Sequence, residues 1–238
     1  MCGLILVALV CSAASTKRFT SDEVIRVGSL LEHDRHICNA VQIESGFYVT
    51  PAACLSTRDP AELELLGKEL SPKVTSKTRC NVTKVQTHPK YLFLSHNIAL
   101  LQVECDHSLG EFQGTSLSDS KPGERLTLAG VNRSLRSVFA HVKTQECSVC
   151  QKEYAVFNCK RQMCLKASGK VSLNVAEGLA GAGIFTQQKK NAKLTGVLSY
   201  GFANGSLVAE RMIYYAQFLQ RTMQEFKSGK SNSPSSKV

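Results

Sequence analysis

The chain has 238 residues, of which 43% are hydrophobic and 20% are charged, and this is the composition of a folded globular protein rather than of a disordered one. It contains no stretch of about 20 consecutive apolar residues, which excludes a membrane-spanning helix. The formal net charge of +10 fits either a solvated basic surface or attraction to polyanions such as glycosaminoglycans, anionic lipids or acidic proteins.

The first residues have the pattern of a secretory signal peptide. Residues 4–11 form a short apolar core, and Ser12, Ala13 and Ala14 supply the small side chains of a cleavage site, although no positive charge precedes the core. We therefore expect residues 1–16 to be removed on export. Residues 17–36 are polar and mixed, and we interpret them as an extended N-terminal arm. An exported chain without a stacking-aromatic motif is not expected to bind nucleic acid.

Short apolar runs separated by turn signals follow the arm. Their lengths and spacing favour an antiparallel all-β domain, either a barrel or a sandwich. Turn-forming pairs such as His88-Pro89 and Pro122-Gly123 fall between the runs. The runs cover residues 40–43, 46–50, 62–66, 82–87, 98–103, 125–129, 138–142, 183–186, 193–200 and 206–209.

The end of the chain has a different period. Between residues 211 and 226, Ile213, Ala216, Leu219 and Met223 recur at helical spacing and predict one amphipathic helix. Residues 227–238 (KSGKSNSPSSKV) are polar, and we expect a disordered basic tail. The sequence thus predicts one domain over residues 37–226, closed by a C-terminal helix.

Cysteines and sequons agree with export. Two of the ten cysteines lie in the signal segment, and an even number of eight remains, which is typical of disulfides in an exported chain. Four of the eight, Cys147, Cys150, Cys159 and Cys164, could instead bind zinc as thiolates, an alternative that the expected compartment disfavours. Glycosylation is predicted at the sequons of Asn81, Asn132 and Asn204.

Three segments together resemble the chymotrypsin/trypsin-like (S1) family of serine proteases. Residues 37–41 (ICNAV) and 48–54 (YVTPAAC) resemble its CGGxLI and TAAHC motifs, and residues 95–103 (SHNIALLQV) resemble NDIALLKL. The glycine-rich segment 177–183 (EGLAGAG) resembles QGDSGGP, and residues 194–201 (LTGVLSYG) resemble LxGIVSWG. The resemblance covers roughly residues 37–226. It implies a trypsin-like double antiparallel β-barrel with the active site between the barrels.

The catalytic side chains of this family are missing. Ala53 stands at the position of the histidine, Asn97 at that of the aspartate and Ala180 at that of the serine. A methyl group neither attacks a carbonyl nor moves a proton, and an asparagine would favour the wrong tautomer of a histidine. We therefore expect no enzymatic activity. The resemblance leaves Gly178 and Ala180 as a remnant oxyanion hole.

A displaced pair of His96 and Ser199 is an alternative that the spacing does not support. On a strand, His96 and its neighbour Asn97 would point to opposite faces, so His96 would not reach the site that Asn97 faces.

Activation by proteolytic cleavage is also not expected. The nearest match to the IVGG-like cleavage segment is residues 26–29 (RVGS), too close to Cys38, and Leu179 replaces the aspartate that would pair with a new amino terminus. Asn174 is the approximate match to the base of the specificity pocket.

Within the resemblance, Cys38–Cys54 and Cys150–Cys164 correspond to family disulfides. Cys80 and Cys105 fall on runs expected to be antiparallel neighbours, which makes a cross-strand bridge plausible, and Cys147 and Cys159 remain to pair with each other. Two further family bridges are absent, because Leu126 and Ala176 occupy their positions.

These features predict a secreted, monomeric, catalytically inactive serine protease homologue, a kind of protein frequent in insects. It would bind no small-molecule cofactor and no metal. It would act as a protein cofactor or a decoy for proteases or their inhibitors. Its partner would be an extracellular protein such as a protease, an inhibitor or a receptor. A basic polyanion-binding or antimicrobial effector on the same scaffold, with a polyanionic glycan as partner, is the alternative. A residual serine endopeptidase ranks last.

Overall fold

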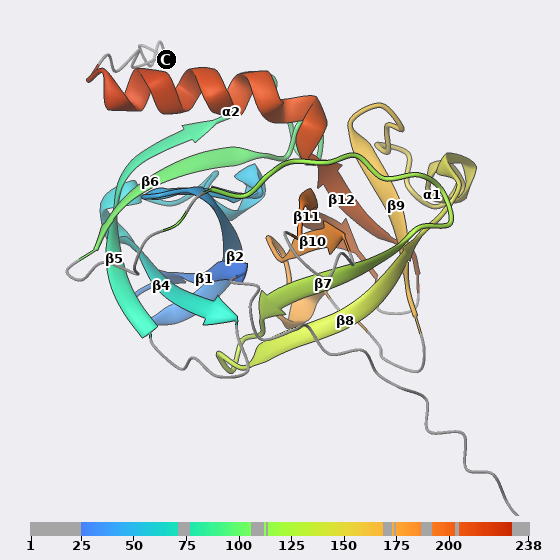
Figure 1. Ribbon diagram of the computed structural model, residues 1–238, viewed down its shortest axis with the longest axis horizontal. Coiled ribbons are helices and arrows are strands. Elements are labelled where there is room, and N and C mark those ends of the chain that lie inside the picture. The colour runs from blue at the N-terminus through green and yellow to red at the C-terminus, as the bar shows by residue number, and fades with distance from the viewer. Residues whose placement is uncertain are drawn as a thin grey trace, which may run out of the picture.

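Two closed antiparallel barrels of six strands each form the protein (Figure 1), and this confirms the predicted fold class. The computed structural model describes residues 25–70, 77–105, 112, 114–168, 173, 175–186, 192–202 and 205–229. The predicted signal peptide, Asn174, Asn204 and nearly all of the predicted tail lie outside these residues.

The first barrel has the strand order β1-β2-β3-β6-β5-β4, with β4 pairing back to β1. Its strands are β1 (Ile25–Glu32), β2 (Arg35–Glu44), β3 (Phe47–Thr50), β4 (Leu63–Leu70), β5 (Lys77–Thr87) and β6 (Ala99–Cys105). The short 3-10 turns η1 (Ala52–Cys54) and η2 (Pro60–Glu62) connect β3 to β4.

The second barrel has the order β10-β11-β12-β9-β8-β7, with β7 pairing back to β10. Its strands are β7 (Arg125–Val131), β8 (Ser137–Thr144), β9 (Gln162–Ala167), β10 (Gly183–Thr186), β11 (Leu194–Gly201) and β12 (Leu207–Arg211). Helix α1 (Cys147–Glu153) follows β8, and the 3-10 turn η3 (Val175–Glu177) precedes the glycine-rich segment.

The predicted boundary of the N-terminal arm is wrong. Residues 25–32 are strand β1, which pairs with both β2 and β4 and is needed to close the first barrel. Two of the polar residues that suggested an arm are buried: Arg26 is 5% exposed and lies over the Phe112 ring, and Ser29 is 1% exposed and forms a hydrogen bond with His36. Polar groups that have hydrogen-bond or ring partners can be buried in a core. The polar composition of residues 17–36 is therefore not sufficient to locate the start of the domain.

Helix α2 (Met212–Lys227) crosses the top of the first barrel (Figure 1), although it follows a strand of the second. Its buried residues are Met212, Tyr215, Leu219 and Thr222, and the first three pack into an apolar cluster with residues of both barrels. The predicted stripe is therefore shifted, because Ile213 is 47% exposed.

Among the described residues there are four disulfides, in the pairs expected from the sequence. They are Cys38–Cys54, Cys80–Cys105, Cys147–Cys159 and Cys150–Cys164. The four cysteines of the zinc alternative are therefore paired with one another as disulfides. Asn81 is exposed on β5, whereas the side-chain oxygen of Asn132 accepts two backbone N–H bonds within the turn after β7.

In the part of the chain that the structure describes, no helix combines the length and the apolar character needed to cross a membrane.

Candidate functional site

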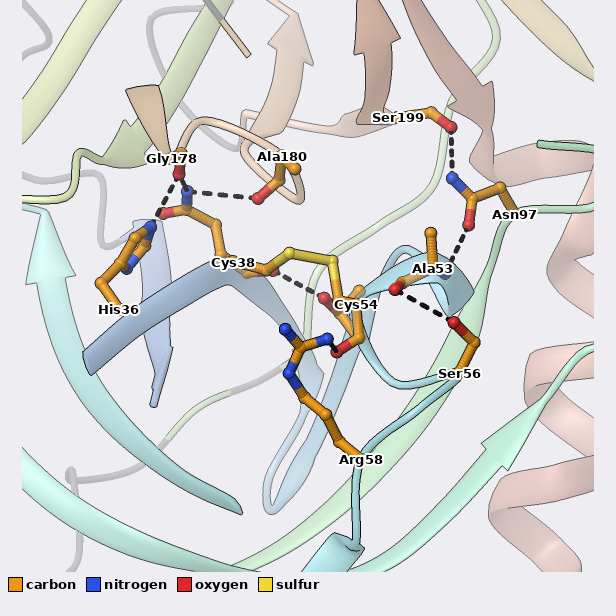
Figure 2. The surroundings of a disulfide bond; sticks show 12 residues. His36, Cys38, Ala53, Cys54, Ser56, Arg58, Asn97, Gly178, Ala180 and Ser199 are labelled. Atoms are coloured by element: carbon orange, nitrogen blue, oxygen red, sulfur yellow. Dashed lines mark hydrogen bonds between the residues drawn. A yellow bond between two sulfur atoms is a disulfide. The ribbon is translucent and has the colours of Figure 1, made fainter. Parts of the chain in front are cut away.

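A short chain of hydrogen bonds connects two of the three positions that correspond to catalytic residues. Asn97 is fully buried, and its side-chain Oδ1 accepts the N–H of Ala53 at 2.8 Å. Its Nδ2 donates to the Ser199 hydroxyl at 2.8 Å. Figure 2 shows this chain, which runs from η1 through the loop before β6 to β11. We refer to Ala53, Asn97 and Ser199 as the Asn97 network.

The third position, Ala180, meets the first barrel from the second. Its carbonyl oxygen accepts the N–H of Asn39 at 2.7 Å, and its side chain packs against the apolar cluster that contains Cys38 and Cys54. Because Cys54 follows Ala53 directly, the Cys38–Cys54 disulfide joins the strand that contacts Ala180 to the turn that carries Ala53 (Figure 2). The fold therefore brings Ala53, Asn97 and Ala180 to the same junction between the barrels.

Asn39 connects the barrels through its buried side chain. Its Oδ1 accepts the Val131 N–H at 2.6 Å, and its Nδ2 donates to the carbonyl oxygens of Val131 and Gly178 at 3.0 and 2.8 Å. With its backbone N–H bound to the Ala180 carbonyl oxygen, this residue reaches two separate backbone segments, the end of β7 and residues 178–180. A buried amide is stable only with such partners, so Asn39 fixes the position of the glycine-rich segment.

The segment Gly178–Gly183, called the glycine turn below, requires glycine for steric reasons. Gly178 and Gly181 have φ values of +94° and +83°, where side chains are strained. A Cβ at Gly181 would lie 1.9 Å from the Asn39 carbonyl oxygen, and a Cβ at Gly183 would lie 2.4 Å from the Phe185 ring. The backbone of the turn is thus packed against the first barrel without room for a side chain at these positions.

The expected remnant oxyanion hole is not formed as predicted. The N–H of Gly178 donates to the carbonyl oxygen of Val175 at 3.1 Å, within the turn that follows η3. The N–H of Ala180 has no partner among the described residues, so one of the two expected donors is free and the other is engaged. Stabilising an oxyanion requires donors already aimed at it, and a pair of such donors is absent here.

His36, on the same strand as Asn39, also contacts the glycine turn. Its Nε2 donates to the Gly178 carbonyl oxygen at 2.7 Å, and its Nδ1 accepts the Ser29 hydroxyl at 2.7 Å. Since a carbonyl oxygen can only accept, Nε2 carries a hydrogen, and Nδ1 accepts from the Ser29 hydroxyl when the imidazole is neutral. Burial lowers the pKa of His36, which favours that neutral form.

The two segments that the resemblance associates with activation are both packed into the fold. Leu179 is 3% exposed and belongs to an apolar cluster with Leu173 and Leu198, where a charged amino terminus would have no counter-ion. The residues 26–29 that resemble a cleavage segment lie inside β1, where residues 27–29 pair with both β2 and β4.

His96 does not pair with Ser199. Its ring stacks on that of His88, with centroids 4.6 Å apart and 8° between the planes. Burial lowers the pKa of His96, and the nearby cations Arg161 and Lys90 lower it further. His96 is thus part of a partly buried aromatic cluster.

The carboxyl group of Glu210 is buried next to Ser199 of the Asn97 network. Glu210 is fully buried; Gln162 Nε2 donates to its Oε1 at 2.7 Å, and the Tyr215 hydroxyl donates to its Oε2 at 2.6 Å. Burial raises the pKa of Glu210 to about 7, partly offset by these hydrogen bonds and by one to Ser199. It faces the hydroxyl of Ser199 from the protein interior and is not placed to act on a ligand.

Large apolar side chains are exposed beside this junction. Leu92 and Phe93, on the loop before Asn97, are 77% and 70% exposed, and Phe202, just after β11, is 72% exposed. The Phe202 ring stacks on Tyr154, with centroids 5.8 Å apart. Leu94 packs on the cluster that contains Tyr154, so the segment that carries Leu92 and Phe93 and the segment that carries Phe202 both adjoin this cluster. Exposed apolar surface of this kind is typical of binding sites.

Sequence reasoning did not identify Asn39, His36 or Glu210. For Asn39 a signal existed, because the residue after the cysteine departs from the CGG motif. For His36 and Glu210 none existed: each is a polar residue at the start or end of a strand, and only the fold brings its partners close.

Comparisons with known proteins agree with this architecture. A family model described as Trypsin matches residues 19–219. A structure of kallikrein-related peptidase 10 in complex with Zn²⁺ is 16% identical, covers 84% of this chain and 95% of its own, and has a TM-score of 0.66. Mouse neuropsin, a serine protease expressed in the limbic system of the brain, is 17% identical, covers 83% and 93%, and has a TM-score of 0.64. At such identities the likeness concerns the fold alone. A search of curated proteins finds no match.

Proposed function

This chain belongs to the trypsin family, and we propose that within that family it is a non-catalytic homologue that acts by binding. In this proposal the protein is exported and serves as a cofactor or decoy for proteases or their inhibitors. Its four disulfides are typical of exported proteins and support that location.

The observation that carries the proposal is the occupancy of the three catalytic positions. Ala53, Asn97 and Ala180 offer no nucleophile, no base and no carboxylate. The Asn97 side-chain amide accepts the Ala53 N–H and donates to the Ser199 hydroxyl, so the three residues form one hydrogen-bonded structural connection. In this family loss of a triad member lowers kcat by roughly 10⁴-fold or more, and the losses act as a unit.

The glycine turn supports the same conclusion. A reactive serine at position 180 would still face a Gly178 N–H that is bound to Val175. Removing one oxyanion donor costs about 10²–10³-fold in rate. These observations support the proposal, since positions 53, 97 and 180 carry no reacting side chain and the Gly178 N–H is already engaged.

Binding is supported by the exposed apolar surface of Leu92, Phe93 and Phe202. Aromatic and aliphatic side chains exposed to this degree lose water favourably when a partner covers them, and aromatic residues are enriched among those that dominate binding energy. The surface borders the junction where a trypsin-family enzyme would bind its protein substrate or inhibitor, which motivates the choice of proteases and inhibitors as partners.

The proposal is tested with trypsin, a panel of Kunitz and serpin inhibitors, and the purified chain. A decoy restores trypsin activity by taking up inhibitor, and a cofactor raises the kcat/KM of a protease toward a protein substrate; in neither case does the chain alone hydrolyse substrate. The F93S/F202S variant should lose most of the effect, and F139S, which alters a partly exposed ring on β8, should keep it.

Hydrolysis by the chain itself, at a rate that is abolished by unfolding, would refute the non-catalytic assignment. An absence of any effect on every protease and inhibitor in the panel would refute the assignment of partner class.

A further inference from the structure

Three cationic side chains lie in a row across the outer surface of the second barrel. Arg125 on β7 pairs directly with Lys143 on β8, and Lys143 pairs directly with Lys166 on β9. All three are exposed. Residues directly opposite each other in an antiparallel sheet point to the same face, so the row is continuous across three strands.

The row is electrostatically unfavourable as it stands. Neighbouring strands lie about 4.8 Å apart, and like charges directly opposite each other destabilise a sheet. Among the described residues, none of the three cations forms an ion pair. The acidic residue nearest to Arg125 in the sequence is Glu124. Its Oε2 accepts a hydrogen bond from the Lys121 backbone N–H at 3.1 Å. An anion with several charges would relieve this repulsion.

A pocket of about 460 Å³ opens beside the row, and Lys143 and Lys166 of the row form part of its lining. The lining comes from the turn before β7, the end of β8, the start of α1 and the end of β9. It includes the polar residues Thr144, Gln145 and Ser168 with a single carboxylate, Glu146. The Thr144 hydroxyl and the Gln145 Nε2 already donate within the protein, to the Lys121 carbonyl oxygen and the Ser206 hydroxyl. The exposed polar groups beside the cations are therefore Ser168 and Glu146, and they suit a ligand that carries both hydroxyls and anionic groups.

We propose that this row and pocket form a binding site for a sulfated linear polysaccharide. Two strand spacings place the outer cations about 10 Å apart, so a chain laid across the strands meets all three. Its sulfates would contact Arg125, Lys143 and Lys166, and its hydroxyls would enter the pocket, where the Glu146 carboxylate can accept a hydrogen bond. A flat membrane reaches the exposed row but not the recess, and an acidic peptide lacks the hydroxyls that the recess is suited to bind.

The site is independent of the function proposed above. It shares no residue with the Asn97 network, the glycine turn or the apolar surface of Leu92, Phe93 and Phe202. It would therefore remain if the non-catalytic assignment were overturned, and its own failure would leave that assignment untouched.

The test measures binding of a heparin octasaccharide by calorimetry at several salt concentrations. The K143Q/K166Q variant should bind about tenfold more weakly at 0.15 M salt, and the slope of log K against log salt should fall by roughly 1.5, as expected for two lost ionic contacts. The control R35Q/K90Q removes the same charge from exposed positions on the first barrel and should retain the affinity. All substitutions are at exposed side chains, and circular dichroism checks folding.

Further arms identify the ligand class. Desulfated heparin should bind at least tenfold more weakly than heparin, and E146Q should change heparin affinity less than twofold. Equal weakening by the row variant and the control would overturn the proposal, because charge alone would then explain binding. Tighter binding to phosphatidylserine vesicles or polyglutamate than to heparin, lost in K143Q/K166Q, would also overturn it in favour of a membrane or an acidic protein.

Discussion

The glycine turn and the Asn97 network meet at the same junction between the barrels, and they differ in what they keep. The glycine turn retains the residues that its backbone requires, since Gly181 and Gly183 have no room for a Cβ. The Asn97 network retains hydrogen-bonded packing but contains no group that could attack or move a proton. Steric demands of the fold and chemical demands of a reaction are therefore separable at neighbouring positions.

The largest effect is expected at Gly181. In G181A the new Cβ would overlap the Asn39 carbonyl oxygen, in a backbone conformation that already disfavours side chains. We expect the free energy of unfolding to fall by about 4 kcal/mol or more, measured by urea denaturation. The control A180S changes the adjacent, partly exposed residue and should lose about 1 kcal/mol or less. A G181A protein as stable as A180S would contradict a steric requirement.

The second effect concerns Asn39, which holds the glycine turn against the first barrel. N39A leaves the Val131 N–H and carbonyl without this partner, whereas the Gly178 carbonyl keeps its bond to His36. Buried polar groups without partners cost about 1–3 kcal/mol each, so we expect a loss of about 3 to 4 kcal/mol. Hydrogen exchange should also accelerate at Val131. Loss of stability without faster exchange at Val131 would contradict the proposed connection.

The third prediction uses Glu210, the titratable group behind the Asn97 network. Burial raises its pKa from 4.5 to about 7, so the folded protein holds the proton more tightly than the unfolded chain. The resulting stability is fully present below pH 4.5 and is lost as the pH rises to about 7. The loss is roughly 3 kcal/mol.

E210Q keeps the shape and cannot titrate, so the difference in stability between pH 4.5 and 7.5 should shrink by that amount relative to the unmodified protein. Denaturant unfolding at both pH values measures it. An unchanged pH dependence in E210Q would mean that Glu210 titrates normally.

The smallest effect is expected from restoring the catalytic side chains. The A53H/N97D/A180S variant would regain the residue types of the triad, but the Gly178 N–H would remain bound to Val175 and Leu179 would remain in its apolar cluster. We expect kcat/KM toward peptide substrates to stay within about tenfold of the unmodified chain. An increase of a thousandfold or more would show that only the side chains were missing.

Much of the fold could be predicted from the sequence, because motifs at residues 37–54, 95–103 and 177–201 fix the order of both barrels. The Cys38–Cys54 and Cys150–Cys164 pairs follow from the same resemblance, whereas the C-terminal helix follows from the helical spacing of its apolar residues. Strand β1 could not be predicted from polarity, since Arg26 and Ser29 are buried through specific partners that only tertiary structure supplies.

The site was less predictable than the fold. The residue types at positions 53, 97 and 180 could be aligned from motifs. The direction of the Gly178 N–H could not, because it depends on a single local turn with Val175. The contacts of Asn39 and Glu210 also depend on strands far apart in sequence, and the cationic row of β7, β8 and β9 depends on strand register.

The most direct test of the central claim is active-site titration of the folded chain with a fluorophosphonate, read by intact-protein mass spectrometry. Trypsin serves as the positive control and the heat-unfolded chain as the blank. We predict no mass increase beyond the blank. A stoichiometric adduct on one serine, formed only by the folded protein, would contradict the non-catalytic assignment.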